Sequence, residues 1–293
     1  MSNTRNKSLT KYLRSLLLIL PLLVALAAYY YHIQKAVRFE VVHFKSNLVG
    51  KVLPYGVVLP PGYGLITSRR IRYPVLYLLH GWSGNYNSWT KQTALMQYAA
   101  EYQMIIITPE GGNGWYTDSA TVPSDQYEAY FIRELIADVD GRLRTIADRR
   151  GRSVAGISMG GYGALKFGFK YPENFSLAAS MSGTVNAAAR TDDVSIMQTF
   201  GEPESPARKT NDLPRLAGEF PADRQALLPY FYLDCGSEDP WLEANRDFSG
   251  VLLERKIVHE YRQLPGNHVW PYWDRQLREV MQIAAERMVP AER

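Results

Sequence analysis

A serine between two glycines is the residue of this chain best suited to chemistry. Residues 152–165 read RSVAGISMGGYGAL, so Ser158 stands in the pattern G-x-S-x-G with Gly156 and Gly160. A short apolar run precedes the serine and a stretch with helical spacing follows it, which predicts a strand, a sharp turn and a helix. Such a turn lifts a hydroxyl above the end of a sheet, where only glycine leaves room for the flanking backbone. This arrangement serves nucleophilic attack on an acyl carbon.

A serine hydroxyl is a weak nucleophile near neutral pH, so it needs a histidine base that a carboxylate orients. His268 is the candidate base, because it lies in a loop after the last predicted strand. Asp239 follows the penultimate strand and is the expected acid, with Glu238 and Asp234 as alternatives. The order Ser158, acid, histidine is the order in which α/β-hydrolase sheets carry a catalytic triad.

Attack on an acyl carbon also requires backbone N–H donors for the oxyanion that develops. We expect one donor from Met159, because it directly follows the serine and begins a helix. The other is expected from the loop His80-Gly81-Trp82 after a buried strand, with Trp82 as first choice and Gly81 as second. The remaining histidines lie in an apolar N-terminal segment or inside predicted strands: His32, His43 and His259.

The elements that must position these residues alternate along the chain. An antiparallel hairpin is expected over residues 37–59. Strands are then expected at 74–79, 104–108, 153–157, 175–181, 227–235 and 259–264, and helices at 88–102, 127–149, 160–171, 241–254 and 270–288. This alternation predicts an α/β fold with a mostly parallel central sheet and helices on both faces. The candidate residues follow strands at their carboxyl ends, where such sheets bind ligands.

One segment interrupts the alternation. Residues 184–226 are polar and contain four prolines, so we expect an excursion from the sheet that roofs the pocket. The single cysteine, Cys235, rules out an internal disulfide and is expected to be a small buried side chain.

The charge distribution argues against nucleic acid as a partner. The net charge of +4 comes from the N-terminus, because residues 1–39 contain six of the 33 Lys and Arg and no acid. The rest of the chain, with 27 basic and 29 acidic side chains, lacks a basic footprint.

The N-terminus resembles an export signal. Residues 1–14 are polar and basic, and an apolar run without formal charge follows at 16–31. We therefore divide the chain into a basic N-terminus with an export segment at 1–36 and an α/β-hydrolase domain at 37–293. An uncleaved membrane anchor is favoured over a signal peptide cleaved after Ala27. Both alternatives place the domain outside the cytoplasm, either anchored to the membrane or secreted into the periplasm or medium.

Five motifs together resemble a known family. They read LLHGWSG at 78–84, GGNGWYTD at 111–118, GISMGGYGA at 156–164, CGSED at 235–239 and PGNHVW at 265–270. In order and spacing they are similar to the esterase branch of the α/β-hydrolases. That branch contains S-formylglutathione hydrolases of the esterase D type, tributyrin and feruloyl esterases, and the mycobacterial mycolyltransferases. The resemblance covers about residues 37–288.

The resemblance implies roles for particular residues. Ser158 would be the nucleophile, Asp239 the acid and His268 the base, with Trp82 and Met159 as oxyanion donors. It also implies that Trp115 and Tyr116 lie near the substrate pocket. Members of the family need no metal and no organic cofactor.

The activity implied is that of a serine carboxylesterase acting on a small-molecule, carbohydrate or lipid ester through an acyl-enzyme on Ser158. An acyltransferase similar to the mycolyltransferases, passing the acyl group to a sugar or lipid alcohol, is the nearest alternative. A catalytically silent binding module on the same fold is a third. The export segment departs from the S-formylglutathione hydrolases, which are cytoplasmic, and nothing in the sequence identifies a trehalose site or a long lipid channel.

Overall fold

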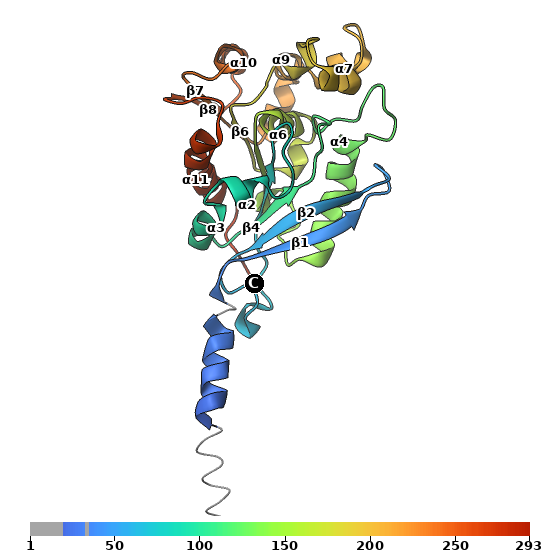
Figure 1. Cartoon of the computed structure of the whole chain (residues 1–293). Helices are drawn as coiled ribbons and strands as arrows, with labels where there is room; N and C mark the ends of the chain where they lie inside the picture. The colour runs from blue at the N-terminus through green and yellow to red at the C-terminus, as the bar shows by residue number, and fades with distance from the viewer. Residues whose placement is uncertain (1–19, 33–34) are drawn as a thin grey trace, which may run out of the picture.

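The structure is a computed structural model that describes residues 20–32 and 35–293. In that part of the chain one sheet has the strand order β1-β2-β4-β3-β5-β6-β7-β8 (Figure 1). Its strands are β1 (Arg38–Lys45), β2 (Val52–Leu59), β3 (Val75–Leu79), β4 (Ile105–Pro109), β5 (Arg152–Ile157), β6 (Leu177–Met181), β7 (Tyr230–Gly236) and β8 (His259–Leu264). Strands β3 to β8 pair in parallel, while β1 and β2 pair antiparallel and β2 continues antiparallel to β4. The predicted hairpin and mostly parallel sheet are both confirmed.

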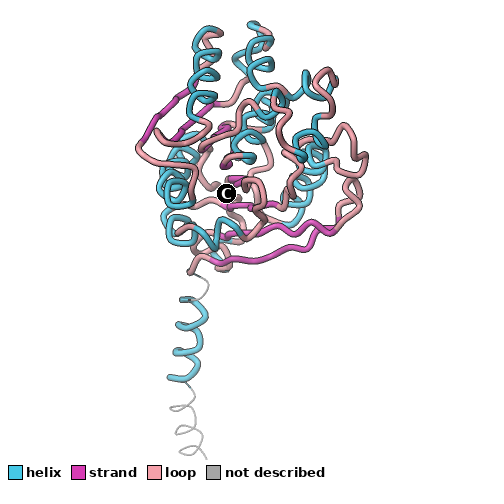
Figure 2. The backbone as a smooth tube through the Cα atoms, turned by 45° about the horizontal axis from the view of Figure 1, so that its top comes forward, coloured by secondary structure: helices cyan, strands magenta, loops and turns pink. Residues whose placement is uncertain are grey.

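Side chains of the central strands alternate between two apolar cores. In β3, Val75, Tyr77 and Leu79 face one core, and Leu76 and Leu78 face the other. The first core is covered by α5 (Ile136–Arg142), α6 (Met159–Lys170) and α10 (Leu242–Glu254), and the second by α2 (Ser88–Gln92), α3 (Leu95–Tyr98) and α11 (Trp270–Arg287). Helices therefore lie on both sides of the strands, as Figure 2 shows.

Two helices predicted as continuous are interrupted. The helix expected at 88–102 consists of α2, α3 and a 3-10 turn, η2 (Ala99–Glu101). The break comes at Ala94, whose N–H binds the carboxylate of Asp274 at 2.8 Å in place of a helical acceptor. Packing against α11 thus outweighs the local helical pattern.

The helix expected at 127–149 is also shorter and less regular. It contains α4 (Tyr127–Ala129), the π-helix η3 (Tyr130–Leu135) and α5, and it ends at Arg142. The chain leaves the helix because the next residues pair with Tyr73, whose N–H donates to the carbonyl of Arg144 at 2.8 Å. The apolar residues beyond Arg142 therefore pack from an extended segment.

The excursion at 184–226 folds into short helices around one buried arginine. They are the 3-10 helix η6 (Ala187–Ala189), α7 (Val194–Phe200), α8 (Pro206–Asn211), α9 (Leu213–Glu219) and the 3-10 helix η7 (Ala222–Leu227). The Arg208 guanidinium donates to the carbonyls of Gly201, Ala188 and Arg190 at 2.6–3.0 Å. These contacts give a polar segment a fixed conformation.

Part of the expected export segment is described. Residues 20–32 form a helix that projects from the domain in Figure 1, and its large apolar side chains are more than half exposed. Among the helices of the described residues, none combines the length and the apolar character needed to cross a bilayer. The predicted segment also includes residues 1–19 and 33–34, which lie outside the described residues.

Candidate active site

The serine sits on a strained turn between β5 and α6. Ser158 has φ +52° and ψ −118°, a conformation that residues with a side chain rarely adopt. A Cβ on Gly156 would lie 2.4 Å from the Gly160 carbonyl carbon, and one on Gly160 would lie 2.5 Å from the Leu79 oxygen. The two glycines are therefore needed for the approach of strand and helix, as the motif predicted.

The serine, the histidine and the aspartate meet above the carboxyl ends of β5, β7 and β8. His268 Nε2 lies 3.0 Å from Ser158 Oγ, and His268 Nδ1 lies 2.9 Å from Asp239 Oδ2. Because an ionised carboxylate only accepts hydrogen bonds, Nδ1 carries the proton and Nε2 accepts from the serine hydroxyl. In this tautomer the imidazole can take the serine proton.

Close packing of two loops brings the histidine to the aspartate. A Cβ on Gly236 would lie 2.4 Å from the carbonyl oxygen of Gly266, so the loops after β7 and β8 could not approach with a larger residue. The N–H of Ser237 also donates to the Leu264 carbonyl at 2.8 Å. Glycines next to the candidate residues thus set the spacing between Asp239 and His268.

Of the three candidate acids, Asp239 is the one in contact with His268. Burial alone would raise its pKa, but hydrogen bonds from the His268 ring and the Trp241 N–H outweigh burial and hold the pKa of Asp239 below its usual value. Asp234 is fully buried and accepts from the Tyr272 hydroxyl at 2.8 Å. Burial raises the pKa of Asp234 to about 7. Glu238 is exposed.

Two backbone segments that could bind an oxyanion lie beside the serine. Met159 is the first residue of α6, so its N–H has no acceptor within the helix. The loop after β3 packs against the serine, because a Cβ on Gly81 would lie 3.3 Å from Ser158 Cβ. Trp82 and Gly81, the two predicted donors of this loop, both line the same cleft as Ser158.

The ring of His80 fixes this loop, a role that the sequence did not indicate. Its Nε2 accepts from the Gly111 N–H at 2.9 Å, so Nδ1 carries the proton and donates to the Gly81 carbonyl at 2.7 Å. The side chain is 1% exposed. The motif HGW at the end of a strand was the available signal, but the partner Gly111 is distant in sequence.

A cleft of about 740 Å³ opens beside Ser158 and His268. Its walls come from the loop after β3, from α2 and from the start of α11. They carry three indole rings and a cationic group: Trp82, Trp270, Trp273 and Lys91. No residue of 184–226 lines this cleft. The expectation that the excursion roofs the pocket is therefore wrong, because its helices pack on the core side around Arg208 and α6.

The two aromatic residues expected in the pocket also lie elsewhere. Trp115 and Tyr116 are 4% and 1% exposed, and neither lines the cleft. The Trp115 indole N–H donates to Ser195 Oγ at 3.0 Å, and the Tyr116 hydroxyl donates to the His80 carbonyl at 3.1 Å. Both rings belong to the core next to α6, so their predicted substrate contact is corrected to a packing role.

Metal-binding groups and the thiol are the other candidate functional groups in the described part of the chain. No group of three or more His, Cys, Asp or Glu in residues 20–32 and 35–293 is placed to hold a metal ion. Cys235 is buried as predicted, and burial raises the pKa of its thiol far above the usual value, so it is not a thiolate.

The fold and the contacts of Ser158 define an α/β-hydrolase whose serine lies on the turn between β5 and α6. The chain belongs to the esterase family, since the family model described as "Putative esterase" matches residues 46–283. The family resemblance that the motifs suggested is confirmed.

Individual relatives agree with this family. The chain is 31% identical over 252 residues to an esterase of Mycobacterium tuberculosis, an alignment that covers 78% of this chain and 55% of the relative. It is 28% identical over 214 residues to an acetyl esterase of Caldicellulosiruptor saccharolyticus, covering 68% and 79%. The chain thus spans about half the length of the mycobacterial relative. A solved ferulic acid esterase superposes with a TM-score of 0.77 and 25% identity, covering 87% of this chain and 99% of that one.

Proposed function

We propose that the chain is a serine carboxylesterase with Ser158 as nucleophile, His268 as base and Asp239 as orienting acid. The observation that carries the proposal is the unbroken contact series from Ser158 Oγ to His268 at 3.0 Å and on to Asp239 at 2.9 Å. The left-handed backbone of Ser158 supports it, since strain of this kind persists where function requires it.

The proposed reaction has two steps. Ser158 Oγ attacks the ester carbonyl carbon while His268 Nε2 takes its proton, and the N–H groups of Met159 and Trp82 stabilise the oxyanion. The tetrahedral adduct expels the alcohol, which receives the proton from His268, and leaves an acyl group on the serine. Water then attacks this acyl group with His268 again as base, which releases the acid and restores the hydroxyl. Asp239 stays ionised throughout.

The walls of the cleft support carboxylic esters of short-chain, carbohydrate-linked or phenolic type as substrates. Trp82 is 51% exposed, and Trp270 and Trp273 also face this cleft. Indole faces bind the apolar faces of sugars and phenolic rings well. Relatives named as acetyl esterase and ferulic acid esterase support the same range.

A labelling experiment tests the nucleophile. A fluorophosphonate probe should label the full chain, and Ser158→Ala should abolish both labelling and turnover of p-nitrophenyl acetate. Ser153→Ala is the matched control, because Ser153 is a buried serine on β5, the strand that precedes Ser158, and its hydroxyl contacts Ser176. Absence of label on the native chain would favour a silent binding module over an enzyme.

Analysis of the products separates hydrolysis from acyl transfer. Turnover in the presence of a sugar or long-chain alcohol should release free acid if the chain is an esterase. New ester in place of free acid would assign it as an acyltransferase, because both activities share the same acyl-enzyme.

We also propose that the domain acts outside the cytoplasm, held by residues 1–36 as a membrane anchor. The basic flank of this segment and the exposed apolar side chains of helix 20–32 support the proposal. Intact mass of the native protein and protease accessibility in whole cells test it. A cytoplasmic, membrane-free protein would contradict it.

A further inference from the structure

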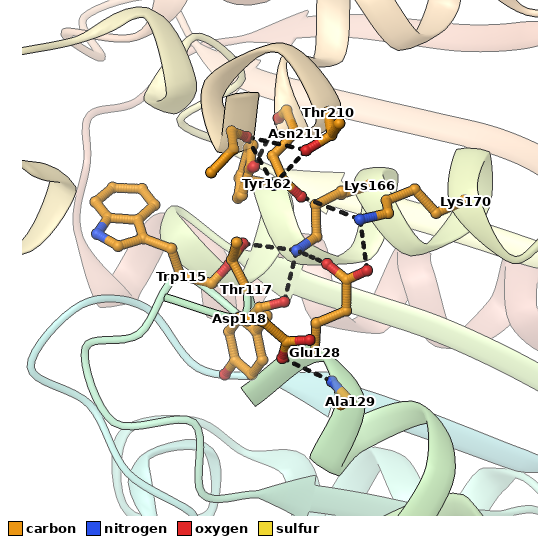
Figure 3. Close-up of polar contacts among 12 residues, drawn as sticks. Trp115, Thr117, Asp118, Glu128, Ala129, Tyr162, Lys166, Lys170, Thr210 and Asn211 are labelled. Atoms are coloured by element: carbon orange, nitrogen blue, oxygen red, sulfur yellow. Dashed lines mark hydrogen bonds and ion pairs between the residues drawn. The ribbon is translucent and has the colours of Figure 1, made fainter. Parts of the chain in front are cut away.

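A buried ammonium on the nucleophile helix binds a loop that is distant in sequence. Lys166 lies two turns after Ser158 and is 0% exposed. Its Nζ lies 2.6 Å from each of three acceptors, the Tyr116 carbonyl, Thr117 Oγ1 and Glu128 Oε2 (Figure 3). All three N–H bonds of the ammonium are therefore used, and its charge is compensated by the carboxylate.

These contacts hold an unfavourable backbone in place. Trp115 and Tyr116 have φ +54° and +50°, a left-handed pair that residues with large side chains rarely form. The bond from Lys166 to the Tyr116 carbonyl fixes this conformation from one side. From the other, the Tyr116 ring lies so close to Gly163 that a Cβ there would be 2.8 Å from it. The position of the tyrosine ring is thus determined by helix α6.

Tyr116 in turn restrains the loop after β3 through a hydrogen bond. Its hydroxyl donates to the His80 carbonyl at 3.1 Å, and the ring of His80 in turn donates from Nδ1 to the Gly81 carbonyl at 2.7 Å. The Gly84 N–H binds the same Gly81 carbonyl at 3.0 Å. Since a peptide unit is planar and trans, fixing the Gly81 carbonyl also fixes the direction of the Trp82 N–H.

We propose that Lys166, Tyr116 and His80 are positioning residues that hold the Gly81–Trp82 peptide in the orientation needed to bind the oxyanion. The proposal rests on the proposed esterase function and adds to it a residue series that does not touch the substrate. Because an oxyanion forms only during the reaction, loss of this support lowers transition-state binding and leaves ground-state binding unchanged.

Tyr116→Phe is the test variant, because it removes one hydroxyl and keeps the ring. Tyr130→Phe is its matched control: Tyr130 is also 1% exposed, and its hydroxyl has no hydrogen-bond partner among the described residues. Both variants lose a buried hydroxyl, but Tyr116 is the one that contacts the proposed series.

The measurement compares a transition-state mimic with a ground-state mimic. A trifluoromethyl ketone adds reversibly to a catalytic serine and forms a tetrahedral oxyanion, whereas the matching methyl ketone binds mainly without addition. In Tyr116→Phe, kcat/KM for p-nitrophenyl acetate should fall about tenfold, less than the 10²–10³ of a deleted oxyanion donor. The inhibition constant of the trifluoromethyl ketone should rise by the same factor and that of the methyl ketone should not change.

A second variant tests the lysine without leaving a buried unpaired charge, because Lys170, which also binds Glu128, is partly exposed. Lys166→Met combined with Glu128→Leu removes both charges of the pair. If Lys166 acts through Tyr116, adding Tyr116→Phe to this double variant should cause little further loss of kcat/KM. Where the double variant does not fold, Tyr116→Phe decides the matter.

Three results would overturn parts of the account, and they are distinguishable. Unchanged kinetics and unchanged trifluoromethyl ketone affinity in Tyr116→Phe would refute the positioning role while leaving the esterase intact. Equal losses in Tyr116→Phe and Tyr130→Phe would assign the effect to general packing and refute it as well. Failure of the native chain to react with the probe or the ester would instead refute the proposed function, and this inference with it.

Discussion

Two positions along helix α6, its start and its third turn, give polar groups opposite environments. At its start, the Ser158 hydroxyl is half-buried at a cleft and contacts a histidine whose side chain is 23% exposed. Eight residues later, the Lys166 ammonium is fully enclosed, with every N–H bonded. A reactive group needs access and a partner that can take its proton, while a buried charge must be compensated completely. Ionisable groups near these two positions should therefore respond differently to substitution.

The largest effect is expected at the cleft end of this comparison. His268→Ala removes the proposed base, so kcat/KM for p-nitrophenyl acetate should fall by about 10⁵–10⁶. Thermal stability should change little, because this side chain is partly exposed. Steady-state kinetics and a melting curve on the same sample check both statements. Retention of even a tenth of the activity would exclude His268 as the base.

The next effect separates two aspartates that are five residues apart. Asp239→Asn should lower kcat/KM by about 10⁴, because an amide favours the wrong tautomer of His268. Asp234→Asn is the matched control, since Asp234 contacts Tyr272 and not the histidine. Its activity at neutral pH should stay within a few-fold of the native value. The reverse ranking would move the acid to Asp234.

The sequence was a good guide where glycines flank the candidate site residues. Ser158 lies between Gly156 and Gly160, Asp239 follows Gly236, and His268 follows Gly266, so each residue sits beside a close backbone approach that the structure requires. The fully buried strands β3, β4 and β6 were predicted for a similar reason. Their apolar runs are short and end in loops that carry the motif residues.

The sequence was a poor guide where a contact joins distant segments. Trp115 and Tyr116 stand in a glycine-rich loop at a strand end, a pattern that fits a pocket as well as a core. The deciding contact comes from Lys166, about 50 residues further on. The helix predicted at 127–149 ends early for the same kind of reason, because the residues after Arg142 form backbone hydrogen bonds with Tyr73.

At Lys166, in the third turn of α6, substitution should cost stability. Lys166→Met leaves the Glu128 carboxylate buried with fewer partners, so the free energy of unfolding should fall by about 3–5 kcal/mol. Urea denaturation measures this loss. The variant Lys170→Met is a useful comparison, because Lys170 is partly exposed and binds the same carboxylate. It should lose clearly less, and an equal loss would show that the enclosed position of Lys166 is unimportant.

Acid should weaken the same buried pair. Burial alone would raise the pKa of Glu128, but Lys166 and Lys170 outweigh burial and lower it to about 2. Because the folded pKa lies below the unfolded value of 4.5, the stabilising effect is complete above pH 4.5 and is lost as the pH falls toward 2. The free energy of unfolding should therefore decline across this window. In Glu128→Gln, the free energy of unfolding should depend less on pH below 4.5. An unchanged pH dependence would contradict the role of Glu128 in this loss.

The smallest expected effect concerns Asp234, an ionisable group on β7. Burial raises its folded pKa to about 7, so the neutral acid stabilises the fold fully below pH 4 and this effect is lost as the pH rises through 7. Asn keeps an oxygen that can accept from the Tyr272 hydroxyl but carries no charge. Asp234→Asn should therefore match the native chain near pH 4 and exceed its stability at pH 8 by about 1–2 kcal/mol. Melting temperatures at the two pH values measure the difference. A variant less stable at pH 8 would mean that the ionised carboxylate has a partner that compensates its burial, as Glu128 has in Lys166.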